Sequence, residues 1–310
     1  MVMKVYTINP CVDAFEMLEQ CAACIGFFDG FHLGHRQLVN ETVNYAKKNG
    51  LLSAVITFDP DPWVVLKGET NVAHIMTIEQ RQKVAEELGI DCWFQIAFTK
   101  ELASFEPNVF IEKVITPLYV KHLVCGFDFT YGKFGKGKAS DLQQYASFTT
   151  TIVQPVTYLE EKISSTRIEN LITSGDMETV ETILARPYTM VSEVVHGHNI
   201  GHKIGFPTIN IDVENTYIIP KCGVYAGYMY HNGNRYIAMI NVGKNPTFHK
   251  NHSISVEAHI LDFNKDVYGD TISLEFKHFI RNEISFSSSD ELIQQLKNDI
   301  STIRNKLKTI

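Results

Sequence analysis

The feature that most limits the fold is a change of pattern near residue 187. Before it, short apolar runs alternate with amphipathic stretches: "ACIGFF", a helix near 35–48, "LLSAVITF", a helix near 78–88, "CWFQIAF", a helix near 107–115 and "HLVCGFDF". Such alternation is typical of a parallel sheet with crossover helices. After it, strand-length runs follow one another. We therefore expect an α/β half and an all-β half.

The second half predicts an antiparallel barrel. Six runs rich in β-branched and aromatic residues extend from "YTMVSEVVHG" to "TISLEFKHFI", and Asn232-Gly233 between two of them is a strong hairpin signal. A last helix begins near Ser289 and repeats apolar residues on one stripe, at Ile293, Leu296, Ile300, Ile303 and Leu307. The predicted domains are residues 1–186 and 187–310, and we expect the second to fold independently.

Composition narrows the environment and the partners. No apolar run approaches the roughly 20 residues that span a bilayer, and "MVMKVYTINP" has no signal-peptide core, so a cytoplasmic location without membrane attachment is expected. The net charge of −7 argues against a nucleic-acid partner, because phosphate backbones are bound by clustered Lys and Arg. Composition leaves the oligomeric state open.

The cysteines point to core packing. Cys21 and Cys24 have the spacing of a zinc-ligand pair, but the other cysteines are scattered and form no second pair. We expect reduced, buried thiols. Two helix starts carry a capping-box pattern, Thr77 with Gln80 and Ser140 with Gln143.

The stretch "CAACIGFFDGFHLGHRQLVN", residues 21–40, joins a predicted buried strand to a predicted helix through glycines and histidines. A strand that enters a helix in this way leaves the first N–H groups at the positive end of the helix dipole, which suits a phosphate. His32 and His35 would add donors; the alternative is two surface histidines in a loop. The order of Gly26, Asp29, His32, Gly34 and His35 resembles the signature of the nucleotidyltransferase superfamily. A nucleotide site is expected here.

A second phosphate-binding element is expected in "ISSTRIENLI". Ser164, Ser165 and Thr166 stand at a predicted helix start with Arg167 beside them. The alternative is a capping box of Thr166 with Glu169. Both can hold, because a cap and an anion share the same helix end.

The barrel half has its own constellation in "GHNIGHKIGFPTINI". Gly197, Gly201 and Gly205 recur every fourth residue without a helical pattern, as in a backbone folded closely over a ligand. Thr208 and Asn210 stand two apart on a predicted strand and would face one side. Their oxygens suit Mg²⁺ bound to nucleotide phosphates, although such residues at a strand start are more often turn residues.

Glu257 lies in an otherwise apolar strand, "VEAHILDF". It is either an ordinary residue of an exposed face or a general base held for a reaction.

Taken together, the motifs resemble the bacterial bifunctional riboflavin kinase and FAD synthetase family over nearly the whole chain. "GFFDGFHLGH" resembles the adenylyltransferase signature and "ISSTRI" the second phosphate element. "GFDFTYGKFGKG" resembles the flavin and nucleotide loop, which implies that Asp128 and Phe129 bind flavin. "GHNIGHKIGFPTIN", "NVGKNPTF" and "VEAHILDFNKDVYG" resemble the kinase module.

The resemblance implies a Rossmann-like nucleotidyltransferase domain followed by a flavokinase barrel with a C-terminal helix. It also implies two reactions, phosphorylation of riboflavin by Mg-ATP to FMN and adenylylation of FMN by ATP to FAD. By resemblance, Thr208 and Asn210 bind Mg-ATP, and Glu257 activates the hydroxyl of riboflavin. His32 and His35 stabilise the adenylyl transition state.

Departures from the family pattern fall mainly in the first domain. Asp61 stands where the family usually has histidine, and Thr130 and Glu169 stand where it usually has arginine. Each change weakens the positive environment that a triphosphate needs. We therefore expect adenylyl transfer to be slow relative to FMN formation.

Two other functions remain open, and a third is disfavoured. One is a riboflavin kinase whose degenerate adenylyltransferase domain still binds nucleotide or flavin. Another is a non-catalytic, flavin-binding regulatory protein. A different nucleotidyltransferase or an aminoacyl-tRNA synthetase is disfavoured, because no "KMSKS"-like loop is present.

Overall fold

We analysed a computed structural model that describes residues 2–69, 72–196, 204–213, 216–244 and 254–308. Its packing divides the chain into two compact units. The first comprises residues 1–72 and 77–164, and the second comprises residues 73–76 and 165–310. The boundary at 186 predicted from the sequence stays a prediction.

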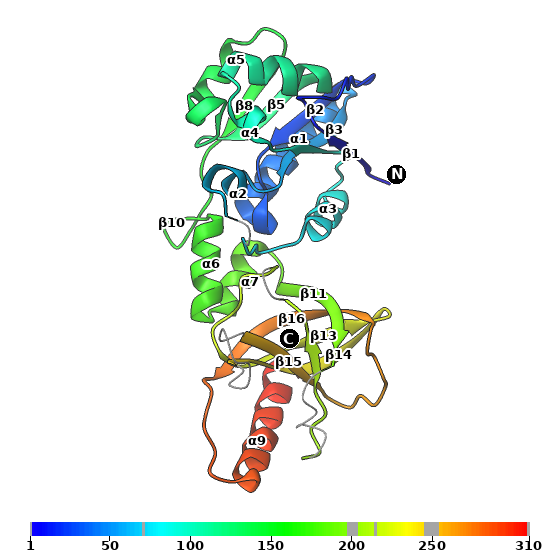
Figure 1. Ribbon diagram of the computed structural model, residues 1–310, viewed down its shortest axis with the longest axis vertical. Coiled ribbons are helices and arrows are strands. Elements are labelled where there is room, and N and C mark those ends of the chain that lie inside the picture. The colour runs from blue at the N-terminus through cyan, green and yellow to red at the C-terminus, as the bar shows by residue number, and fades with distance from the viewer. Residues whose placement is uncertain (1, 70–71, 197–203, 214–215, 245–253, 309–310) are drawn as a thin grey trace. The chain divides into compact units, whose positions relative to one another are not determined.

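A six-stranded parallel sheet forms the centre of the first unit (Figure 1). Its strands are β1 (Lys4–Ile8), β2 (Cys21–Ile25), β3 (Leu52–Asp59), β4 (Cys92–Ala97), β5 (Val120–Gly126) and β8 (Thr149–Val153). Their order is β1-β4-β3-β2-β5-β8. Strands β3 and β4 follow β2 on one side of it, whereas β5 and β8 lie on its other side. The carboxyl ends of β2 and β5 thus form a topological switch point, where open α/β sheets bind ligands.

Helices and short turns connect these strands. They are η1 (Asp29–Phe31), α1 (Leu33–Asn49), α2 (Pro62–Lys67), α3 (Ile78–Glu87), α4 (Lys100–Ala103), α5 (Pro107–Phe110), η2 (Ile111–Ile115), η3 (Thr116–Leu118), η4 (Lys133–Gly135) and η5 (Ala139–Gln144). Two small antiparallel pairs complete the unit: β6 (Thr130–Tyr131) with β7 (Gly137–Lys138), and β9 (Thr157–Tyr158) with β10 (Glu161–Lys162).

Two local predictions about helix starts had different outcomes. The capping box of Thr77 with Gln80 is present at the start of α3 and is confirmed. The box of Ser140 with Gln143 is wrong: Ser140 lies inside η5, and Asp141 accepts the backbone N–H of Lys138 instead.

In the second unit, six antiparallel strands close into a barrel in the order β11-β12-β15-β14-β13-β16. They are β11 (Tyr188–Val195), β12 (Ile209–Ile211), β13 (Gly223–His231), β14 (Asn234–Lys244), β15 (Ile254–Ile260) and β16 (Thr271–Arg281). The predicted hairpin joins β13 to β14, with Asn232 and Gly233 both at positive φ. The expected fold class is thus confirmed.

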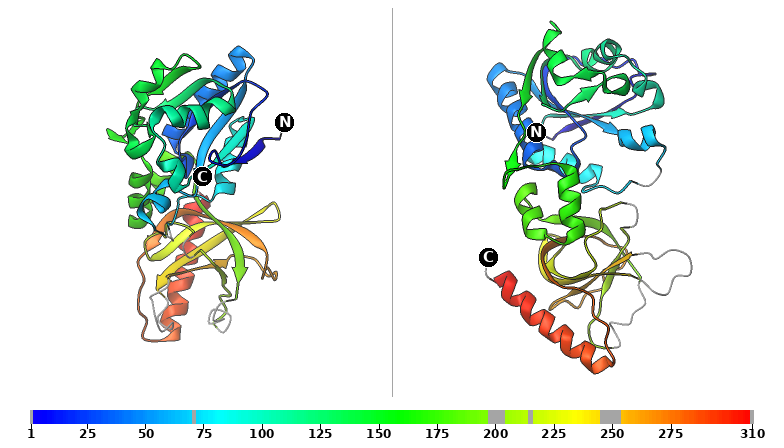
Figure 2. Two further views of the ribbon diagram at one scale, coloured as in Figure 1. Left: turned by 45° about the horizontal axis from the view of Figure 1, so that its top comes forward. Right: turned by 90° about the vertical axis from the view of Figure 1, so that its left-hand side faces the viewer.

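Helix α9 (Ser289–Lys308) packs against the outside of the barrel, on β13, β14 and β16 (red in Figures 1 and 2). Ile303 and Leu307 of the predicted apolar stripe are buried against Val224 and Met239, which confirms the face that the stripe covers. Helices α6 (Ser165–Ser174) and α7 (Met177–Leu184) also belong to this unit, and α7 packs on β11 and β16.

A short segment from the first half of the sequence completes the second unit. His74 forms a bridge with Tyr217, through the bonds His74 N to Thr216 O and Ile218 N to His74 O. Ile75 and Met76 are buried. Residues 73–76 are therefore part of the packing around the barrel.

Candidate functional site

Helix α1 follows β2 at the switch point, separated from it by η1, and His32 caps the helix. The Nδ1 atom of His32 accepts the backbone N–H of His35 at 3.3 Å, and the two imidazole rings stack with centroids 3.7 Å apart. Because Nδ1 is an acceptor, a neutral His32 carries its proton on Nε2. The helix cap thereby fixes which nitrogen can donate to a ligand.

Gly34 explains why a glycine separates the histidines. A Cβ atom at this position would lie 3.1 Å from Cε1 and 3.2 Å from Nδ1 of His32, closer than a side chain normally packs. The glycine thus lets the capping ring fold over the first helical turn. The amides of Leu33 and Gly34 lack an intrahelical acceptor, so they can bind an anion at this helix end.

The run before His32 has an unusual backbone. Phe28, Gly30 and Phe31 have φ of 59°, 80° and 42°. Positive φ costs about 1–3 kcal/mol at a non-glycine residue. Both phenylalanine rings are fully buried and stack with centroids 5.4 Å apart, so their burial offsets that cost. Asp29 lies between the two phenylalanines in the sequence and is also buried. The signature predicted that it is a polar residue of the nucleotide site.

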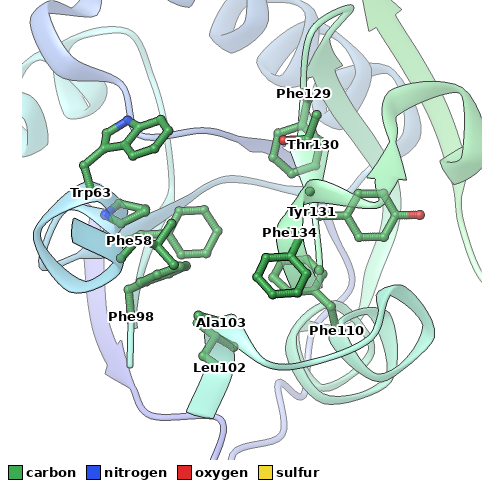
Figure 3. Close-up of a pocket in the computed structure, with 14 residues that line it drawn as sticks. Phe58, Trp63, Phe98, Leu102, Ala103, Phe110, Phe129, Thr130, Tyr131 and Phe134 are labelled. Carbon is green, nitrogen blue, oxygen red and sulfur yellow. The ribbon is translucent and has the colours of Figure 1, made fainter. Parts of the chain in front are cut away.

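An aromatic cavity of about 510 Å³ lies in the same unit (Figure 3). Phe58, Trp63 and Phe98 form one wall and face Phe110, Phe129, Tyr131 and Phe134 on the other. Trp63 and Phe134 are 58% and 89% exposed, so they stand at the rim. Such a slot suits a flat, largely apolar ring system.

Phe129 lines this cavity, as the sequence led us to expect for a flavin-binding residue. Asp128 lines a neighbouring hollow instead and pairs with Lys162, whose Nζ lies 2.5 Å from Oδ2 of Asp128. Sequence reasoning missed the other aromatic residues of the cavity, which are spread along the chain from Phe58 to Phe134. Thr130, where the family usually has arginine, lines both hollows.

The predicted second phosphate element begins α6. The helix starts at Ser165, so Thr166 lies in its first turn rather than at the cap, and the proposed box of Thr166 with Glu169 is wrong in that form. Ser164 belongs to the first compact unit, whereas Ser165 and Arg167 belong to the second. A role of these residues in phosphate binding stays a prediction.

In the barrel, a row of polar side chains crosses three neighbouring strands. Asn210 on β12 lies directly opposite Glu257 on β15, which in turn lies opposite Asn241 on β14. The neighbours Val256 and Ala258 are buried on the other face of β15. Glu257 therefore faces away from the barrel core and beside two amides.

Thr208 lies one residue before β12, not on the strand as expected, so strand periodicity does not fix its direction. It lines a cavity of about 310 Å³ with the segment 263–268. Nδ1 of His259 lies 2.8 Å from the carbonyl oxygen of Pro207, next to Thr208. His259 shares the face of Glu257, two residues away, and this period-2 signal could have identified it.

Four predicted glycines have not yet been described. Gly205 has φ of 84°, which requires a glycine-like backbone. Gly197 and Gly201 lie outside the described residues. Gly26 directly follows β2, the strand that leads into the histidine motif, and its N–H is bonded to Ile56 O at 3.1 Å.

The cysteines of the first unit behave as core residues. Cys21, Cys24, Cys92 and Cys125 are buried, and burial raises the pKa of their thiols, to about 12 for Cys21 and about 11 for Cys92. Three positions apart on a strand, Cys21 and Cys24 face opposite sides of the sheet and do not share a ligand. All six cysteines are free thiols.

No metal-binding group of three or more His, Cys, Asp or Glu side chains occurs within the described part of the chain. In the same ranges, no helix is both long and apolar enough to cross a membrane.

The first unit has a histidine-capped helix at the switch point of a parallel sheet. The second unit is a barrel that presents a carboxylate between two amides. These features are typical of a two-domain transferase that uses nucleotides. Residues 14–167 match the family model described as FAD synthetase, and residues 184–307 match riboflavin kinase. The chain belongs to the family of bifunctional riboflavin kinase/FMN adenylyltransferase enzymes.

Relatives with that name support this assignment. The protein of Listeria monocytogenes is 40% identical over 89% of this chain and 88% of its own length. Those of Bacillus subtilis and Escherichia coli K12 are 38% and 31% identical, each over 92% of both chains. A solved structure from Streptococcus pneumoniae, titled a macrolide-efflux protein, has a TM-score of 0.89 and 33% identity, covering 98% of this chain and 99% of that one.

Proposed function

We propose that this protein phosphorylates riboflavin to FMN in the barrel unit and adenylylates FMN to FAD in the first unit. The observation that carries the proposal is the pairing of Glu257 with Asn210 across β12 and β15, together with the family membership. The regulatory alternative is not favoured, because both parts of the chain match families of enzymes.

In the kinase reaction, Glu257 would accept the proton of the 5′-hydroxyl of riboflavin while the hydroxyl oxygen attacks the γ-phosphorus of ATP. The bond to the β-phosphate oxygen breaks and ADP leaves. The hydroxyl of Thr208 and the amide oxygen of Asn210 are hard donors that fit Mg²⁺. The nucleotide phosphates would supply further ligands to such an ion.

In the adenylyl transfer, a phosphate oxygen of FMN attacks the α-phosphorus of ATP, and pyrophosphate leaves. The Nε2–H of His32 and the amides of Leu33 and Gly34 would stabilise the charge that develops on the phosphates. His35 stacks on His32 and holds the ring in place. The aromatic cavity would take the isoalloxazine ring of FMN, with Phe129 in its wall.

The kinase-only alternative is less favoured. The FAD synthetase model matches residues 14–167. In addition, Asp61 is not an isolated negative charge, because the guanidinium of Arg81 lies close enough to interact with it. We keep Mg²⁺ as the metal, riboflavin, FMN and ATP as the small-molecule partners, and the cytoplasm as the location, as proposals.

The test is the product profile of the full chain with riboflavin, ATP and Mg²⁺, followed by separation of the flavins. FMN and FAD are both expected, and FMN alone would refute the function of the first unit.

Flavin placement can be tested separately by fluorescence. Trp63 stands at the rim of the cavity, whereas the only other tryptophan, Trp93, is fully buried in β4. Added FMN should quench the emission of Trp63, and Trp63→Phe should abolish this change. Quenching that persists in Trp63→Phe would place the flavin elsewhere.

A further inference from the structure

Arg81 is a buried cation on α3 that no motif of the sequence singles out. Its side chain is 4% exposed. Nη1 donates to the carbonyl oxygen of Phe27 at 3.0 Å, and the guanidinium carbon lies 4.7 Å from the centroid of the Phe27 ring. A buried charge is tolerated only with hydrogen bonds and opposite charge around it. These contacts therefore determine where Arg81 can lie.

The carboxylates of Asp29, Asp59, Asp61 and Glu79 attract this guanidinium electrostatically. Asp29 lies in η1, Asp59 ends β3 and Asp61 caps α2, where its Oδ1 accepts the N–H of Trp63 at 2.8 Å. Burial lowers the pKa of Arg81, and these carboxylates act in the opposite direction. Asp61 is itself only 8% exposed, so its charge needs a nearby cation.

The carbonyl that Arg81 binds begins the strained run before His32. Thr57 Oγ1 donates to the same Phe27 oxygen at 3.2 Å. Phe28, Gly30 and Phe31 follow with positive φ, and His32 then caps α1. Positive φ is unfavourable at Phe28 and Phe31, and such conformations persist only where the surrounding structure holds them. Arg81 holds the first carbonyl of this run.

We infer that Arg81 is a positioning residue for adenylyl transfer: by binding the Phe27 carbonyl at the start of this run, it presents His32 to the reacting phosphates. The inference rests on the adenylyl transfer proposed above. Arg81 also attracts the negative charge of Asp61, which stands where the family pattern usually has histidine. Arg81 does not line the aromatic cavity, so its effect falls on the reaction rate and not on flavin binding.

The kinetic test compares Arg81→Met and Arg81→Lys in the full chain. Lys83→Met is the matched control, because Lys83 lies on the same helix but is exposed. Arg81→Met should lower kcat for FAD formation by about 10- to 100-fold, the range for one lost hydrogen bond to a charged group. The KM for FMN should change by less than about twofold, since uniform binding is untouched.

Arg81→Lys should recover a large part of the lost rate, because it restores the charge and one donor. Lys83→Met should match the wild-type protein. FMN formation, measured in the same samples, controls for the amount of protein and for the folding of the barrel unit, and it should stay unchanged in all variants. An unchanged kcat for FAD in Arg81→Met, or a parallel loss of both activities with a lower Tm, would overturn the inference.

Hydrogen exchange gives a readout that needs no turnover. Arg81→Met should speed exchange of the amides in residues 28–35, which include the capped N–H of His35, and Lys83→Met should not. If the wild-type protein makes FMN but no FAD, the proposed function of the first unit fails, and exchange then decides the role of Arg81. Acceleration confined to 28–35 supports it, whereas unchanged or global acceleration refutes it.

Discussion

The two candidate sites differ in how they treat charge. In the first unit, Asp29, His32, Asp61 and Arg81 are all buried, whereas Asn210, Glu257 and Thr208 of the barrel are half-buried. A buried set of charges must balance itself within the protein, while water can stabilise a half-buried carboxylate. The first site therefore depends on residues distant in sequence, and the second follows from the register of neighbouring strands.

The largest expected effect tests whether the barrel is autonomous. The side chains of Met177, Val180, Ile183 and Leu184 on α7 are almost fully buried. At about 1.5–3 kcal/mol per side chain, their loss approaches the stability of a whole domain. A fragment 165–310 should therefore fold and phosphorylate riboflavin, whereas 187–310 should unfold at a much lower temperature. Equal Tm values for the two fragments would support the boundary at 186.

Next in size is the effect of Glu257→Gln on the barrel site. The amide keeps the shape but cannot accept a proton, so FMN formation should fall by about 10²- to 10⁴-fold. Riboflavin binding, measured by flavin fluorescence, should change little. Glu275→Gln is the control, because Glu275 is another partly buried carboxylate of the barrel that bonds to Tyr230 instead. Near-normal turnover of Glu257→Gln would make Glu257 an ordinary residue of that face.

Restoring cations at two departures from the family pattern should raise adenylyl transfer. The double change Thr130→Arg with Glu169→Arg returns positive groups that the family usually has, and FAD formation should rise by about 10-fold. The charge-free pair Thr130→Gln with Glu169→Gln controls for side-chain size. Adding Asp61→His should give no further gain, because it removes a carboxylate partner of Arg81. A large additional gain in FAD formation from Asp61→His would contradict the proposed electrostatic role of Asp61 beside Arg81.

The smallest effect concerns pH and a residue outside both sites. His122 stacks on Tyr45 with ring centroids 3.6 Å apart, and its two nitrogens bond to Thr149 and Thr151. Burial lowers its pKa below the ordinary value of 6.5, so the unfolded chain binds a proton more readily than the folded one. Its contribution to the free energy of unfolding is present above pH 6.5 and is lost on acidification.

This predicts that the unfolding free energy of the wild-type protein falls between pH 7 and pH 5 more than that of His122→Gln. Denaturant titrations at both pH values measure the difference. A parallel decrease in both proteins would show that other groups account for the acid sensitivity.

The sequence was sufficient for the elements whose residues are close together. The alternation before residue 187, the Asn232-Gly233 hairpin and the stripe of α9 correctly predicted the sheet, the barrel and the terminal helix. The predicted residues of helix caps were less reliable, because a free backbone N–H can bond to any of several nearby acceptors. At η5 the acceptor is Asp141, which bonds to the N–H of Lys138. Arg81 could not be identified, since an arginine on an amphipathic helix is normally exposed. Only tertiary packing brings it to Phe27.

The segment 73–76 has a consequence for engineering chimeras. The chain passes between the two compact units at 72/73, 76/77 and 164/165, so the barrel unit is not a contiguous cassette. In a chimera that takes residues 165–310 from a relative, the incoming barrel would pack against the host's His74, Ile75 and Met76 and not against the corresponding residues of the relative. Strand bonding through His74 is independent of side chains, but the buried Ile75 and Met76 must fit the incoming barrel. Successful exchange of these enzymes' halves therefore requires moving four residues that lie almost 90 positions upstream of the junction.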